Sequence, residues 1–167
     1  MRQVAEKIGY SATTIYRYYE NKDDVLVAII SDGFKQFQHE LKTAAASEKD
    51  SLERIEAIGR TYINFGLKNP VYYQLMFMQR SDLLHQPFEK DGSEAPIQSF
   101  TVLRQAVEQA IRDKSLKSKN AEKCSSALWA LVHGVTSLAI SQAPQFGDGE
   151  LKATIDAALD MGIKGLN

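Results

Sequence analysis

The sequence contains a single cysteine, Cys124, in 167 residues, so no disulfide can form within the chain. This excludes the small secreted folds that depend on disulfides and makes a reducing cytoplasm the natural setting. No apolar run is long enough to suggest a membrane span, and the first residues lack a basic-then-apolar signal peptide. We therefore expect a cytoplasmic protein.

The sequence also lacks the residue spacings of common catalytic and metal sites. Its histidines, His39, His85 and His133, are far apart, and none stands with Cys, Asp or Glu at a metal-ligand spacing. There is no glycine-rich phosphate loop and no G-x-S-x-G elbow. Cys124 lies on an apolar helical stripe, which indicates a buried thiol rather than a reactive one. We expect no enzymatic activity, no metal and no cofactor.

The sequence also lacks an excess of charge of one sign, since the formal net charge is only −1. The protein as a whole is therefore not a polybasic nucleic-acid binder. Residues 1–22 nevertheless hold four basic and two acidic side chains, a net charge of +2, which leaves −3 on the remainder. A positive end on an acidic body is compatible with DNA binding through that end.

What the sequence has in abundance is apolar residues at helical spacing, with no sustained period-2 alternation. Hydrophobic residues make up 44% and charged residues 25%, the balance of a soluble globular protein. The expected fold class is all-α. Ser11 and Asn21 are expected N-caps, and Pro70 a first helical residue. Helices are predicted over residues 2–8, 12–18, 22–46, 51–68, 70–79, 96–113, 120–143 and 150–165, with the main loop at 85–95.

The first two predicted helices are short and are joined by a tight turn that contains Gly9. This is the arrangement of a helix-turn-helix, and Gly9 can adopt the left-handed conformation that ends the first helix. A small core is expected to fix the angle between the helices. Its predicted members are Val4, Ala5, Ile8, Ile15 and Tyr19.

The run from Arg2 to Leu26 resembles the DNA-binding signature of the TetR family. A generic helical bundle is the alternative, and it explains Tyr19 as a core residue. It does not explain the segment 16–18, because three large polar-tipped side chains in a row cannot all face one core. The resemblance is carried by Arg2, Val4, Ala5, Gly9, Ser11, Thr14, Ile15, Tyr16, Tyr18, Tyr19, Lys22, Val25 and Leu26.

The resemblance implies that the helix 12–18 enters the major groove of DNA. Thr13 would read a base or a thymine methyl, and Arg17 would contact a guanine or a phosphate. The implied DNA-binding residues are Ser11, Thr13, Thr14, Tyr16, Arg17, Tyr18 and Lys22.

In the family another helix precedes this motif, so the resemblance implies a first helix that is missing before Met1. The alternative function is then a dimerisation and ligand-binding module that does not bind DNA.

Trp129, His133 and Gly134 within one long predicted helix resemble the WHG type of TetR-family C-terminal domain. For Trp129 and His133 the alternative is ordinary packing in a core. In the family a small-molecule effector binds inside the helical body, and mostly aromatic lining residues suit an apolar or aromatic effector. The implied ligand-binding residues are Tyr62, Phe65, Tyr73, Phe77, Phe100, Leu103, Trp129 and His133.

The last two predicted helices resemble the pair that forms the homodimer interface in the family. The expected organisation is a DNA-binding head with its connecting helix over 1–46 and a sensing and dimerisation domain over 47–167. The expected function is a repressor that binds a palindromic operator on double-stranded DNA and is released by the effector. The implied interface residues are Leu128, Leu131, Val135, Leu138, Ile155, Leu159, Gly162 and Ile163.

Overall fold

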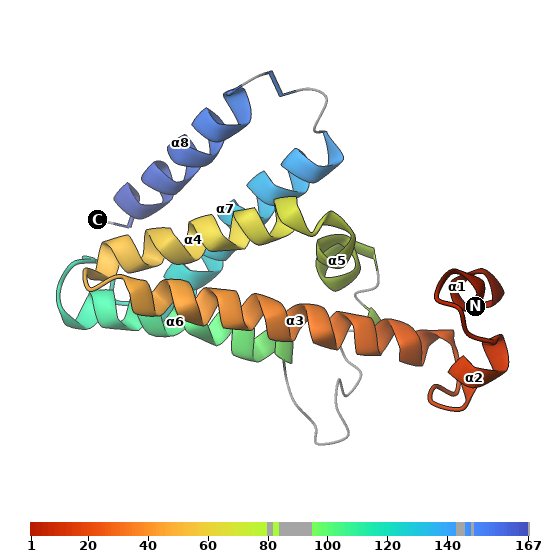
Figure 1. Cartoon of the computed structure of the whole chain (residues 1–167). Helices are drawn as coiled ribbons and strands as arrows, with labels where there is room; N and C mark the ends of the chain where they lie inside the picture. Colours follow the sequence, from red (N-terminus) through yellow and green to blue (C-terminus); the bar gives the residue numbers. More distant parts are fainter. Residues whose placement is uncertain (80–81, 84–94, 143–145, 148, 167) are drawn as a thin grey trace.

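A computed structural model describes residues 1–79, 82–83, 95–142, 146–147 and 149–166. Throughout this described part the regular structure is helical, which confirms the all-α fold class. Two short helices, α1 (Arg2–Lys7) and α2 (Ala12–Tyr16), sit at one end of the long helix α3 (Lys22–Ser47), and the other helices form a bundle that includes its far part (Figure 1). The predicted loop at 85–95 falls almost wholly outside the described residues.

Local signals set the boundaries of the first helices as expected. The Ser11 hydroxyl accepts a hydrogen bond from the N–H of Thr14 at 3.1 Å. The Asn21 side-chain oxygen accepts hydrogen bonds from the N–H groups of Asp23 and Asp24, at 2.7 and 3.0 Å. Gly9 has a φ of 73°, the left-handed conformation that ends α1.

The helix α2 ends at Tyr16, two residues earlier than predicted. The N–H groups of Arg17 and Tyr18 bond to carbonyls three residues back, those of Thr14 and Ile15, at 3.3 and 3.0 Å. Such bonds tighten the last turn and end the α-helix.

The body is a bundle around α4 (Ser51–Lys68), which packs on α3, α6, α7 and α8. Besides α4, the helix α6 (Ala95–Arg112) lies along α3, while α7 (Ala121–Ser141) also packs on α6 and α8 (Glu150–Lys164). These bounds lie within a few residues of the predicted ones.

The prediction of a single helix over 70–79 is wrong in its second half. The segment consists of α5 (Pro70–Gln74) followed by a π-helical turn, η1 (Leu75–Gln79). In η1, Met76 is fully buried and its Sδ lies against α3. A Cβ added to Gly33 of α3 would lie only 2.8 Å from this Sδ. A π-turn cannot be told from an α-turn by a five-residue apolar pattern, because both bury the same residues.

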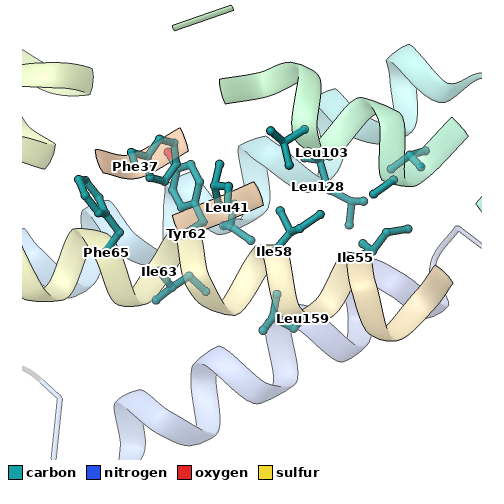
Figure 2. Close-up of a cluster of buried hydrophobic side chains, with 14 of the residues drawn as sticks. Phe37, Leu41, Ile55, Ile58, Tyr62, Ile63, Phe65, Leu103, Leu128 and Leu159 are labelled. Atoms are coloured by element: carbon teal, nitrogen blue, oxygen red, sulfur yellow. The ribbon is translucent and has the colours of Figure 1, made fainter. Parts of the chain in front are cut away.

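The core is aromatic around Phe37 and aliphatic toward the N-terminal end of α4 (Figure 2). Phe37 contacts the rings of Tyr62, Phe65 and Phe77 with centroids 4.9 to 5.8 Å apart. Figure 2 shows Ile55, Ile58 and their aliphatic neighbours continuing this core along α4.

The expectation that no segment could cross a membrane needs correction, because α7 is long and apolar enough by length and composition. This is weak support for a membrane span. The core helix of a soluble protein passes the same test, and α7 packs against α4, α6 and α8.

Candidate DNA-binding head and ligand cavity

The predicted DNA-binding residues lie at the surface of the head, which comprises α1, α2 and the first turn of α3. Tyr18 is 79% and Tyr16 is 48% exposed, and the side chains of Thr13, Arg17 and Lys22 are exposed as well. Ser11 is also exposed. Thr14 is half-buried, and its hydroxyl lies 2.8 Å from that of Ser11. Two large aromatic rings at the surface suit contacts with a partner better than packing in a core.

The expected small core of the head is only partly covered in the structure. Ala5 is buried and Ile15 and Tyr19 are half-buried. Val4 and Ile8, by contrast, are 47% and 56% exposed.

A cavity of about 430 Å³ lies between α3, α4, α6, α7, α8 and η1, and it is partly open to solvent, since Ile97, Ser126 and Trp129 of its wall are exposed. Its volume falls in the range of small-molecule sites, and its wall is almost entirely apolar. Among the described lining residues Glu122 is the only one with a formal charge, and it is exposed at the rim. The wall consists of Phe34, Phe37, Leu41, Ile55, Ile58, Gly59, Tyr62, Phe77, Ile97, Ser99, Phe100, Leu103, Glu122, Ser126, Leu128, Trp129, Val132, Leu159 and Ile163.

Five of the eight residues predicted to bind ligand line this cavity, namely Tyr62, Phe77, Phe100, Leu103 and Trp129. The other three lie behind the wall. Phe65 is fully buried against Phe37, while Tyr73 and His133 hydrogen-bond to Tyr62.

Sequence reasoning missed the contribution of α3, which supplies Phe34, Phe37 and Leu41 to the wall. Their helical stripe was visible in the sequence. A stripe alone, however, does not distinguish a cavity wall from a filled core.

A set of four side chains, which we call the polar cluster, lies next to the apolar cavity: Tyr62, Tyr73, Trp129 and His133. The Tyr73 hydroxyl is 2.7 Å and the Tyr62 hydroxyl 3.1 Å from His133 Nδ1, and the two hydroxyls are 3.2 Å apart. The Trp129 indole stacks on the His133 ring with centroids 5.3 Å apart. Tyr62 and Trp129 belong to both the cluster and the cavity wall.

The polar cluster is electrically neutral at physiological pH. Burial raises the pKa of Tyr62 far above its ordinary value, and burial also raises the pKa of Tyr73. Burial lowers the pKa of His133, which favours the uncharged imidazole. The cluster can therefore exchange hydrogen bonds with a bound molecule but offers it no charge.

The predicted interface residues divide into two groups. Leu138 is 50% exposed, and Leu131, Val135, Ile155, Gly162 and Ile163 are half-buried. The assignment of Leu128 and Leu159 to an interface needs correction, because both are buried within the chain and line the cavity.

Gly162 also serves packing within the chain. A Cβ at this position would lie 2.6 Å from Leu131 Cδ2 on α7. Gly162 therefore allows α7 and α8 of one chain to approach each other closely.

Two family models match the chain. The model described as "Tetracyclin repressor-like, C-terminal domain" matches residues 55–164, and the one described as "Bacterial regulatory proteins, tetR family" matches residues 1–29. No match was found among curated proteins. Neither description names the WHG type, which stays a prediction.

Several solved structures share the fold. A protein of unknown function from Rhodococcus sp. RHA1 has a TM-score of 0.81 and 22% identity, with 99% of this chain and 83% of that chain covered. FadR from Bacillus subtilis, solved with stearoyl-CoA, has a TM-score of 0.78 and 14% identity, with 98% and 87% covered. PfmR from Thermus thermophilus has a TM-score of 0.74 and 14% identity, with 99% and 88% covered.

The helix-turn-helix head, the hollow helical body and a C-terminal family match over more than half of the chain agree with one another. Members of the matched family bind DNA and small-molecule effectors and act as dimers, and they are not enzymes. The chain belongs to the TetR family of bacterial transcriptional regulators.

Proposed function

We propose that this chain is a cytoplasmic, homodimeric repressor that binds a palindromic operator and is released by a small apolar or aromatic effector. The observation that carries the proposal is the apolar cavity of about 430 Å³ in the body. A cavity of this volume with an apolar wall suits a small apolar molecule. FadR from Bacillus subtilis was solved with stearoyl-CoA, a ligand with a long apolar chain. That relative supports an apolar effector here.

The helix α3 offers the physical link between effector and operator. It begins in the head at Lys22, and its far part supplies Phe34, Phe37 and Leu41 to the cavity wall. A helix of 26 residues is about 39 Å long, so a small tilt at the cavity displaces the head by a larger distance. An effector that favours one tilt of α3 would then change the spacing of the two heads on DNA.

The proposed dimer uses the outer faces of α7 and α8. Leu138 is 50% and Met161 is 64% exposed, and Ala127, Ala130 and Ala157 on the same helices are exposed as well. A two-fold dimer through this face would present two α2 helices to successive major grooves, which is why we propose a palindromic operator.

The test is binding of the purified protein to a labelled fragment of its own upstream region at two salt concentrations. We expect saturable binding that survives excess random DNA and weakens as salt rises. Arg17→Ala should weaken this binding by about tenfold or more, as expected for one base or phosphate contact.

Arg104→Ala is the matched control, because Arg104 is an exposed arginine on α6 in the body. Its operator binding should equal that of the wild type. If both variants lose DNA binding equally, or if the wild type does not bind specifically, the upstream region does not contain an operator that α2 contacts. If only the body then bound ligand and dimerised, the function would be that of a sensing module without DNA binding.

A further inference from the structure

The few polar groups of the cavity wall are unevenly distributed. Ser99 and Ser126 contribute hydroxyls from α6 and α7, and Glu122 lies at the rim. The Tyr62 hydroxyl is backed by the buried hydroxyl of Tyr73 and by the half-buried His133 ring, on which Trp129 stacks. At the polar cluster a polar group of a ligand therefore meets a connected network of hydrogen-bonding groups.

The hydrogen-bond inventory of the cluster shows what it can offer. If His133 Nδ1 carries a lone pair, it accepts the Tyr73 proton at 2.7 Å, and Tyr62 donates to Tyr73 at 3.2 Å. The Tyr62 oxygen then keeps acceptor capacity. If Nδ1 carries the proton, it donates to Tyr73, Tyr73 donates to Tyr62, and the Tyr62 proton is left for another acceptor. The tautomer of His133 thus decides whether Tyr62 accepts or donates.

The same surroundings disfavour a charged group on the ligand. Within the described wall no lysine or arginine is present, and the carboxylate of Glu122 would repel an anion. Burying an unpaired charge is costly, whereas a neutral hydroxyl or carbonyl needs only one or two hydrogen bonds. A neutral group that donates, accepts or does both matches a cluster that can adopt either polarity.

We propose that the effector is a neutral molecule with an apolar body and a single hydrogen-bonding group, a hydroxyl or a carbonyl, which binds the Tyr62 hydroxyl. Tyr73 and His133 are positioning residues that fix the direction of this hydrogen bond. The inference rests on the proposed function in one respect, that the cavity is the effector site.

The test compares the affinities of the full chain and its variants for three probes, octane, octanol and octanoate. Octanol is about 10 Å long, comparable to the rise of α3 between Phe34 and Leu41, two residues of the wall. Binding is read from the fluorescence of Trp129, the only tryptophan of the chain and part of the wall. A thermal shift upon ligand addition provides a second readout.

Tyr62→Phe should weaken octanol binding by roughly three- to tenfold, the value of one net hydrogen bond. Octane binding should change by less than about twofold, and this also reports that the variant is folded. Octanoate should bind the wild type at least about tenfold more weakly than octanol, because its charge has no partner in the wall.

Tyr73→Phe is the matched control, since it removes a buried phenol hydroxyl that does not line the cavity. Its octanol affinity should fall less than that of Tyr62→Phe, because Tyr62 keeps His133 as a partner at 3.1 Å. If the wild type binds octane and Tyr62→Phe binds octanol as tightly as the wild type does, this inference is overturned but the cavity remains the effector site. The same conclusion follows if the wild type binds octanoate as tightly as octanol. No binding of any probe by the wild type would overturn the cavity as the effector site as well.

Discussion

Gly66 lies where α4 packs closely against Thr136 of α7. A Cβ at this position would overlap with Thr136 Cγ2 and would lie 2.9 Å from Tyr73 Cδ2. Both neighbours are fully buried, and the Thr136 hydroxyl is tied to the Val132 carbonyl at 2.6 Å. Neither can move aside easily, so the crossing of the two helices depends on the missing side chain.

We therefore predict that Gly66→Ala destabilises the protein by about 1–3 kcal/mol, the usual cost of an overpacked core. The measurement is urea unfolding followed by circular dichroism. Asn64→Ala, at an exposed position of the same helix, is the control and should stay within about 0.5 kcal/mol of the wild type. A Gly66→Ala variant as stable as the control would show that the helices separate without cost.

Asp156 links α8 to α4 through a second kind of contact, an ion pair with Arg60 at 2.6 Å. Hydrogen bonds from Lys152 and Arg60 hold the pKa of Asp156 below its ordinary value. A carboxyl whose folded pKa is depressed stabilises the protein above its unfolded pKa, and this contribution is lost as the pH falls through the folded pKa. The pair is partly exposed, so its contribution is small.

The pH prediction is that Asp156→Asn lowers the melting temperature slightly at neutral pH and not at all at a pH below the folded pKa. Thermal unfolding across the acid range measures it. Asp160→Asn is the control, because among the described residues the ion pair of Asp160 is with Lys164 on its own helix. A difference between wild type and Asp156→Asn that persists unchanged in acid would rule out the ion pair as its source.

At the scale of elements, the outer faces of α7 and α8 carry the prediction for the dimer. Leu138→Asp would place a carboxylate in the proposed interface, where the desolvation of its unpaired charge costs several kcal/mol. We expect the dissociation constant of the dimer to rise by roughly tenfold or more. The helix content should not change. Analytical ultracentrifugation measures the association.

Val71→Asp is the matched control, because Val71 on α5 is 69% exposed and lies outside the proposed interface. It should leave the association unchanged. If Leu138→Asp associates as tightly as the wild type, the dimer forms through another face.

The starts of the elements could be predicted from the sequence because each depends on local chemistry. Ser11 and Asn21 cap α2 and α3 with their own side chains, and Pro70 begins α5. The π-turn after Gln74 could not be predicted, since α- and π-turns bury the same apolar residues over so short a stretch. Element boundaries follow from side chains within four residues, whereas the turn type depends on what packs against it.

At the scale of the whole molecule, the residues that line the cavity could be predicted from the sequence only in part. Phe65 and Phe77 are both aromatic residues at helical spacing, yet only Phe77 lines the cavity. The polar cluster joins Tyr62 and Tyr73 to His133, which is 71 and 60 residues further along the chain. The sequence predicts which residues are inside, but only the packing of six elements decides which of them face empty space.

The last prediction concerns the link between cavity and DNA. Leu103 lines the cavity from α6 and is almost fully buried. Leu103→Trp would fill part of the 430 Å³ with its own indole and so compete with the effector. If effector binding in the cavity causes release, the variant should bind the operator as the wild type does but require about tenfold or more ligand for release. Gel-shift titration with octanol as the test ligand measures both quantities. Release of the variant at the wild-type octanol concentration would mean that the ligand acts at a site other than this cavity.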